Sequence, residues 1–223
     1  MEILDYAKLS QEVFDEINLA RHVPNSLVSN IIGKYQYFNG NIYGPPDELP
    51  IETYEGEKAL NEALDFLKEQ QPLPVIASNQ LLQKVALEYA EDITESGDLT
   101  NPHIDTHDTT PSQRISRVMK WTKMAGECIA VGSKNASDIV ASLIIDDGNE
   151  ERSNRKVLFD KDARLGGVVC IPHSIFGVLT VIDLVGGTYD NPMMTQMQPE
   201  AEQEQQQEAQ GEPQQQPGFT QQY

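Results

Sequence analysis

Histidine and carboxylate side chains gather within one short stretch of the chain, which reads His103-Ile104-Asp105-Thr106-His107-Asp108. Imidazole nitrogen and carboxylate oxygen are ligands that zinc accepts, and imidazole also exchanges protons near neutral pH. A polar loop that binds nothing is the alternative interpretation of the same stretch. Further candidates for chemistry stand later in the chain, at Glu127, Asp146, Asp147 and Asn154.

Apolar residues at helical spacing predict several helices that would position these side chains. Residues 10–21 place Val13, Phe14 and Ile17 on one face, with Ser10 as the N-cap. A second helical stretch opens at Pro24. A further helix is predicted over 53–70, with Thr53 and Glu57 near its start. The next is predicted to begin at Ser78 or Asn79, to run to Ser96 and to stop at Gly97. Two more are predicted over 111–119 and 137–145.

Strands are predicted mainly in the last part of the chain. Residues 127–131 read as a short strand, and the Val- and Ile-rich runs 166–172 and 176–185 read as an antiparallel hairpin. Helices therefore come first, and a small sheet closes the domain. This order predicts an α+β fold, in the form of a three-layer αβα sandwich with a small antiparallel sheet flanked by helices.

The composition divides the chain into three parts. Residues 1–8 are predicted to be a lead-in, and residues 9–192 one domain. Residues 193–223 contain 12 Gln and no Lys or Arg, so they offer little apolar surface to offset the entropy of ordering. We therefore predict that this Gln- and Glu-rich segment is a disordered tail.

The charge balance restricts the classes of partner. The chain carries 35 Asp and Glu against 16 Lys and Arg, which gives a formal net charge of -19. Such a chain repels phosphate backbones and anionic bilayers, so nucleic acid and membrane surfaces are excluded as expected partners. Protein partners with basic surfaces, in a larger assembly, fit this charge better.

Cysteine usage and the N-terminal residues bear on the cellular compartment. The chain has two cysteines, Cys128 and Cys170, both in apolar runs, and we predict two buried thiols; a disulfide is the alternative. The sequence Met1-Glu2-Ile3-Leu4-Asp5 lacks the basic and apolar regions of a secretory signal. We therefore expect a cytoplasmic protein rather than a secreted one.

Several motifs together resemble the CAP superfamily, the SCP-like domains of cysteine-rich secretory, antigen 5 and pathogenesis-related proteins, and in particular its eukaryotic SCP-like type. They appear in order as the stretch from Phe14 to Arg21, Thr53-Tyr54-Glu55-Gly56, Pro111 with Arg114, Gly126-Glu127-Cys128-Ile129, Asp146-Asp147-Gly148, His173 and Gly186-Gly187. The resemblance covers roughly residues 9–187. It implies the three-layer fold, with a polar cleft at its centre.

The resemblance also implies a tetrad of two histidines and two acids in that cleft, where some members bind zinc. Carried over, the tetrad falls on His103, Glu127, Asp146 and Asn154, so an asparagine stands where the family has its second histidine. An amide oxygen is a weak zinc ligand and relays no proton near neutral pH. We therefore expect a degenerate site with no metal; if zinc binds at all, His103 and Glu127 would hold it. His107 or His173 could compensate only if the fold turns one of them inward.

Three hypotheses about function follow from these observations. The leading one is a non-enzymatic CAP-fold protein-binding module in a larger intracellular assembly, of which an axonemal (ciliary) or cytoskeletal one is an example. The alternative is an active CAP protein, either a metal-dependent hydrolase with Glu127 as base or a binder of lipids or sterols. A third is a secreted or vacuolar protein with an unusual leader, in which Cys128 and Cys170 would be oxidised.

Overall fold

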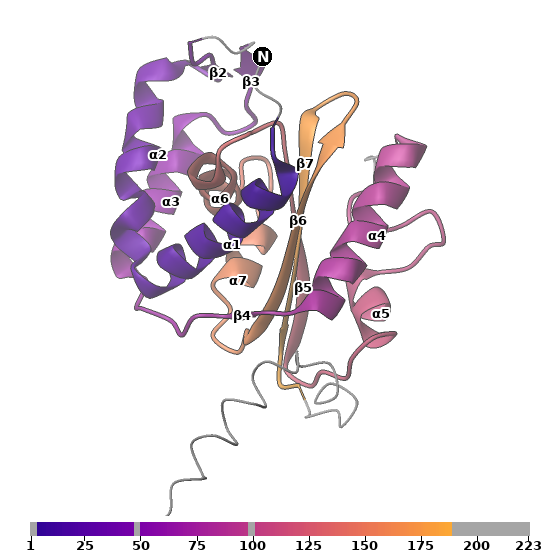
Figure 1. Cartoon of the computed structure of the whole chain (residues 1–223). Coiled ribbons are helices and arrows are strands. Elements are labelled where there is room, and N and C mark those ends of the chain that lie inside the picture. Colours follow the sequence, from indigo (N-terminus) through magenta and orange to yellow (C-terminus); the bar gives the residue numbers. More distant parts are fainter. Residues whose placement is uncertain (1–3, 47–49, 98–100, 189–223) are drawn as a thin grey trace, which may run out of the picture. The chain divides into compact units, whose positions relative to one another are not determined.

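A computed structural model of the protein describes residues 4–46, 50–97 and 101–188 (Figure 1). The predicted tail at 193–223 and the first three residues of the predicted lead-in lie outside the described residues. The described residues form one compact unit. No helix among the described residues combines the length and the apolar character needed to cross a bilayer.

The helices precede the final pair of strands, as predicted, and the other two strands of the main sheet lie between helices in the chain. The helices are α1 (Tyr6–His22), α2 (Val28–Lys34), α3 (Glu57–Glu69), α4 (Gln80–Ser96), α5 (Pro111–Ser116), α6 (Ala136–Ile145) and α7 (Ser153–Leu158), with 3₁₀ turns at Pro24–Leu27 and Tyr35–Tyr37. The strands are β1 (Phe38–Asn39), β2 (Ile42–Tyr43), β3 (Ile51–Glu52), β4 (Ala77–Ser78), β5 (Met124–Val131), β6 (Leu165–His173) and β7 (Gly177–Gly186).

The main sheet has the order β4-β6-β7-β5, and a second, three-stranded sheet has the order β1-β2-β3. The hairpin of β6 and β7 confirms the predicted one, and β5 pairs antiparallel with β7 so that Glu127 stands opposite Asp183. The two-residue strand β4 joins the other edge in parallel. The small β1-β2-β3 sheet and the helix α7 were not predicted from the sequence.

Helices cover both faces of the main sheet, which confirms the three-layer αβα arrangement of an α+β fold. In Figure 1, α4 and α5 lie on one side of the sheet, and α1, α6 and α7 lie on the other. The strand side chains alternate accordingly. Cys128 and Val168 belong to the core on the α1 and α6 side, whereas Leu179 and Val181 pack with Tyr89 of α4.

The start of α1 differs from the prediction. The helix begins at Tyr6, and the carboxylate of Asp5 caps it by accepting a hydrogen bond from Lys8 N at 3.0 Å. Ser10 is therefore not the N-cap. Its hydroxyl donates to Tyr6 O at 2.7 Å and accepts from Cys170 N at 2.8 Å, which fastens α1 to β6.

The start of α3 was also predicted wrongly. The helix begins at Glu57, and Thr53 lies outside it, because the amide and hydroxyl of Thr53 both donate to Asn41 O at 2.8 Å. Gly56 supplies the turn into the helix with φ +58, and a Cβ there would stand 2.8 Å from Asn41 Oδ1. The contact with Asn41 therefore decides where this helix starts.

Local sequence signals predicted other helix ends and the cysteines more accurately. Asn79 caps α4 by accepting hydrogen bonds from Leu81 N and Leu82 N, and the helix ends at Gly97 in the left-handed conformation, both as predicted. Helix α5 starts at Pro111 as predicted but ends at Ser116 rather than at residue 119. Cys128 and Cys170 are buried free thiols, which confirms that prediction.

Candidate functional site

Two of the four tetrad candidates, His103 and Glu127, are in direct contact. Strand β5 directs Glu127 to the face covered by α4 and α5, and His103 Nδ1 lies 3.0 Å from Glu127 Oε1. Arg114 of α5 donates from Nη2 to Glu127 Oε2 at 2.7 Å. The Glu127 side chain is 0% exposed, so both oxygens are engaged inside the protein.

Arg114 also holds the loop that carries His103. Its Nη1 donates to Thr109 O at 2.7 Å and to His103 O at 3.1 Å, and its guanidinium carbon lies 4.0 Å from the centre of the Tyr89 ring. Tyr89 Oη in turn accepts from His103 N at 2.8 Å. Burial, and then the charge of Glu127, raise the pKa of Tyr89 to about 12. Arg114 and Tyr89, which sequence reasoning did not place in the site, thus fix His103 in its positive-φ conformation.

Asp105, in the His103 to Asp108 stretch, organises the loop from within. Its Oδ1 accepts from His107 N at 3.0 Å and from Thr109 N at 2.8 Å, and its Oδ2 accepts from the Thr109 hydroxyl. Burial raises the pKa of Asp105, but these hydrogen bonds and the charge of Arg114 outweigh it, so the pKa lies below its usual value. His107 and Asp108 are exposed on the same loop. Asp105 therefore acts as a turn-forming side chain.

Asp183 is a buried acid that sequence reasoning missed. It stands opposite Glu127 on β7 and is 0% exposed; its carboxyl group accepts no hydrogen bond among the described residues, and the Glu127 carboxylate lies within hydrogen-bonding reach of it. Burial, and then the negative charge of Glu127, raise the pKa of Asp183 well above its usual value. The neutral carboxylic acid is favoured. A single Asp within the apolar run Val181-Ile182-Asp183-Leu184-Val185 was the available signal.

The other two tetrad candidates, Asp146 and Asn154, also contact each other. Asp146 ends α6 with φ 55; its Oδ1 accepts from Asn154 Nδ2 at 2.8 Å and its Oδ2 from Asn154 N at 2.9 Å. Asn154 Oδ1 accepts from Ile129 N of β5 at 3.4 Å, and Asn154 O lies 3.5 Å from Cys128 Sγ. Asp146 and Asn154 thus join α6, α7 and β5.

The two pairs flank β5 without touching each other. Glu127 and Cys128 are consecutive in the strand and point to opposite faces, and Asn154 lies against Cys128. Within the described part of the chain, no hydrogen bond or ion pair joins His103 or Glu127 to Asp146 or Asn154. Nor do three or more His, Cys, Asp or Glu side chains group there in a way that could hold a metal ion.

His173, named as a possible replacement for the second histidine, lies at the turn between β6 and β7. It is buried, its Nδ1 accepts from Ile175 N at 3.2 Å and from Phe176 N at 3.3 Å, and its ring packs on Phe176 with centroids 5.0 Å apart. Among the described residues, no hydrogen bond or ion pair joins the side chain of His173, or that of the exposed His107, to either tetrad pair.

The motifs around Glu55 and Asp147 meet in a network of ion pairs. Asp147 accepts from Tyr54 N at 2.8 Å and from Glu55 N at 2.9 Å. Arg152 donates to both oxygens of Glu55, at 2.6 and 2.7 Å, and also to Glu62 of α3. Asp147, a candidate for chemistry in the sequence, therefore fastens the segment before α3 to the loop after α6.

The same network includes a carboxylate shared by two arginines. Glu62 accepts from Arg152 at 2.7 Å and from Arg155 of α7 at 2.8 Å. The hydrogen bonds from Arg152, and next those from Arg155, lower the pKa of Glu62 to about 2 against the opposing effect of burial. Glu62, Arg152 and Arg155 were not among the predicted site residues, because their partners are about 90 residues apart in the chain.

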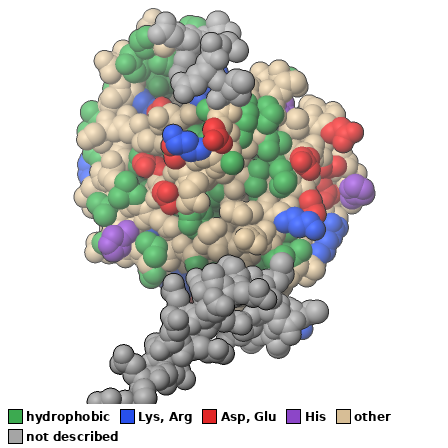
Figure 2. Space-filling model, in the orientation of Figure 1, with side chains coloured by type: hydrophobic (Ala, Val, Ile, Leu, Met, Phe, Trp, Pro, Cys, Tyr) green, Lys and Arg blue, Asp and Glu red, His purple; other side chains and the backbone are tan. Residues whose placement is uncertain are grey.

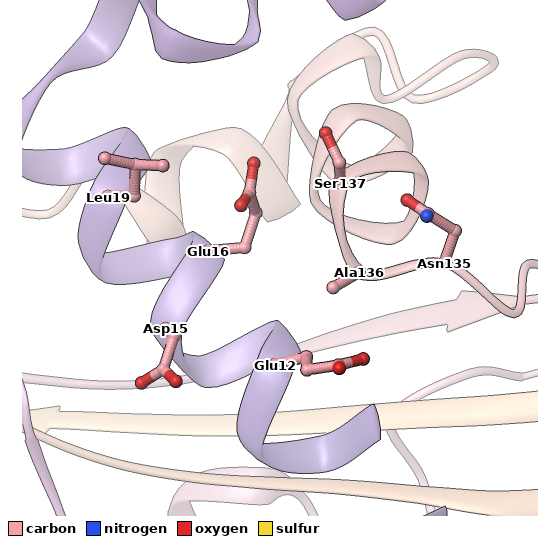
Figure 3. Close-up of a pocket in the computed structure, with 7 residues that line it drawn as sticks. All are labelled: Glu12, Asp15, Glu16, Leu19, Asn135, Ala136 and Ser137. Carbon is pink, nitrogen blue, oxygen red and sulfur yellow. The ribbon is translucent and has the colours of Figure 1, made fainter. Parts of the chain in front are cut away.

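A separate, acidic hollow lies between α1 and the start of α6 (Figure 3). Glu12, Asp15, Glu16 and Leu19 come from α1, and Asn135, Ala136 and Ser137 face them. In the close-up the Glu16 side chain points toward Ser137. On the face of the molecule shown in Figure 2, basic side chains are few and lie close to acidic ones.

Comparisons with known proteins gave matches to solved structures only. No family model matches the chain, and no curated protein does. An outer surface protein from Borrelia burgdorferi matches 62% of this chain and 97% of its own, with 24% identity and a TM-score of 0.44. An extracellular SCP-domain protein from Bacillus anthracis matches 58% of this chain and 39% of its own, with 17% identity and a TM-score of 0.41.

The CAP domain of enterococcal PrgA matches 70% of this chain and 69% of its own, with 15% identity and a TM-score of 0.35. Solved SCP and CAP domains are therefore structural neighbours of this chain. At these identities and TM-scores, the chain is similar to them in structure.

Proposed function

We propose that this chain is a non-enzymatic protein-binding module with a CAP-like fold, in which the four tetrad candidates stabilise the domain. The observation that carries the proposal is the state of Glu127. Its side chain is 0% exposed, and its two oxygens are taken by His103 and Arg114. A general base must reach the proton that it removes, directly or through one water.

Asp146 and Asn154 support the same proposal. The carboxylate of Asp146 accepts from the backbone and side chain of Asn154, and Asn154 reaches the edge of β5. Removing such a buried acceptor leaves its donors unsatisfied, which costs stability. These contacts give both residues a structural role that needs no substrate.

The charge of the molecule supports a basic protein surface as the partner. The net charge is -19, and Glu12, Asp15 and Glu16 line a hollow beside the half-exposed Leu19. Acidic surfaces attract basic partners and accelerate their association. We place this partner in an intracellular assembly, such as an axonemal or cytoskeletal one, and the free thiols of Cys128 and Cys170 are consistent with a reducing compartment.

The partner can be sought by purifying the tagged chain from its own cells under mild salt. We expect a stoichiometric set of co-purifying proteins. Replacing Glu12, Asp15 and Glu16 together by Gln should release them. The matched control replaces Glu88, Glu91 and Glu95, three exposed carboxylates of α4, and should leave the set unchanged.

The absence of catalysis needs its own test, with purified chain and panels of ester, peptide and phosphoester substrates. We expect no turnover above that of the buffer. The proposal is wrong if the chain hydrolyses one of them, and if His103→Ala abolishes the activity while circular dichroism shows the variant folded. A chain recovered alone and carrying a lipid would also contradict it.

A further inference from the structure

A hollow beside α7 combines aromatic walls with a floor of arginines. It has a volume of about 370 Å³, at the small end of the range for ligand pockets. Phe66 of α3 and Phe159, just after α7, form the apolar wall, with ring centroids 5.0 Å apart and planes at 80°. Arg152 and Arg155 lie beside this wall, and the Arg155 guanidinium carbon is 5.3 Å from the centre of the Phe66 ring.

The two guanidinium groups are held in place by the backbone. Arg152 Nη1 donates to Asp146 O at 2.8 Å and to Asn149 O at 2.9 Å, and Arg155 Nη2 donates to Ile145 O at 3.1 Å. Both side chains are nearly buried. Backbone acceptors thus hold both arginines in addition to Glu62, and the N–H groups that face Glu62 form a site for a carboxylate.

Glu62 fills that site in the structure, and it is the most exposed of the three side chains. Its side chain is 45% exposed, against 8% for Arg152 and 5% for Arg155. Arg152 keeps a second carboxylate, Glu55, whereas Glu62 is the carboxylate partner of Arg155 among the described residues. If Glu62 turns toward solvent, the charge of Arg155 is left with backbone acceptors.

We propose that this hollow binds small aromatic carboxylates. The carboxylate of the ligand takes the place of Glu62 on Arg152 and Arg155, and its ring packs on Phe66 and Phe159. Aromatic rings attract one another in offset or edge-on arrangements, and a bidentate contact between arginine and a carboxylate is the stronger class of hydrogen bond. Lys156, which is exposed at the rim, is paired with Glu151 at 3.2 Å. This site is independent of the proposed protein-binding function.

The test uses the full chain and phenylacetate as the probe, followed by NMR shifts of α3 and α7 amides. Acetate supplies the charge without the ring, and 2-phenylacetamide supplies the ring without the charge. We expect phenylacetate to bind at least about tenfold more tightly than either control. Equal binding of phenylacetate and the amide, or no shift at α3 and α7, would overturn the proposal.

Variants separate the role of Glu62 from general effects of charge. Glu62→Gln removes the competing carboxylate and should tighten phenylacetate binding, whereas Arg155→Met should weaken it by about tenfold or more. Glu69→Gln changes an exposed carboxylate elsewhere on α3 and should leave the affinity unchanged. Unchanged affinity in a folded Glu62→Gln variant contradicts the proposal. If that variant does not fold, the comparison of the three ligands on the unmodified chain decides.

Discussion

At the scale of single residues, the unusual feature is a fully buried carboxyl group that accepts no hydrogen bond among the described residues and faces a second carboxyl group. Asp183 faces Glu127 across β5 and β7, and burial together with that charge raises its pKa well above the usual value. An acid whose pKa is higher in the folded chain makes the folded state bind more protons than the unfolded state. The free energy of unfolding therefore falls as the pH rises above the unfolded pKa of about 3.9.

The variant Asp183→Asn should remove this loss of stability. We expect it to be more stable than the original chain at pH 7, and the difference should shrink toward zero as the pH falls to 4. Between the unfolded and folded pKa values the difference should grow by about 1.4 kcal/mol per pH unit. Urea unfolding at several pH values measures it, with the exposed Glu91→Gln as control. If the stability gain of Asp183→Asn over the original chain is smaller at pH 7 than at pH 4, the pKa of Asp183 is not raised.

Residue 154 gives a second prediction at this scale. Asn154→His restores the histidine that the CAP resemblance implies, but we expect no zinc affinity. His103 and Glu127 contact each other and Arg114, and Asp146 is occupied by the backbone of α7. Isothermal titration with zinc measures the result. Tight binding that is lost again when His103→Ala is added would mean that the two pairs share one cleft after all.

At the scale of elements, Asp146 connects the end of α6 to the start of α7. Asp146→Asn places an amide group against the donors of Asn154 and Arg155 and should cost about 1–3 kcal/mol of unfolding free energy. Chemical denaturation of both proteins measures this cost. Glu150→Gln, in the same loop but exposed, is the matched control and should change the stability little. If both variants change the free energy of unfolding equally, Asp146 does not connect α6 to α7 as proposed.

The limits of sequence reasoning also appear at this scale. Both ends of α4 were predicted, the start at Ser78 or Asn79 and the stop at Gly97, because the residues that cap a helix stand directly beside it in the sequence. The predicted start of α3 at Thr53 was wrong because Thr53 donates to Asn41, a residue outside the predicted helix. The CAP motifs placed His103 and Glu127 in one site, and in the structure His103 Nδ1 lies 3.0 Å from Glu127 Oε1. Asp183 was missed because strand patterns carry no information about what lies opposite.

At the scale of the whole molecule, the acidic excess opposes compaction. With 35 acidic and 16 basic side chains, like charges repel throughout the folded chain. Salt screens this repulsion over about 10 Å at 0.1 M, while the nearly buried pairs of Arg152 are screened less. We expect the thermal midpoint at pH 7 to rise by a few degrees between about 0.01 and 0.15 M NaCl. Calorimetry measures it, and a falling midpoint would show that ion pairs, not net charge, dominate.

The hydrogen bond from Cys170 N to the Ser10 hydroxyl spans 160 residues, and it bears on how the chain is made. Helix α1 packs on β6, which is synthesised long after α1. Until then its apolar residues, Leu9, Val13 and Ile17 among them, have no sheet to cover them. Contacts between such distant segments slow folding and prolong the exposure of apolar surface. Helix α1 therefore keeps its apolar face exposed for longer during folding than a helix whose partners are near in sequence.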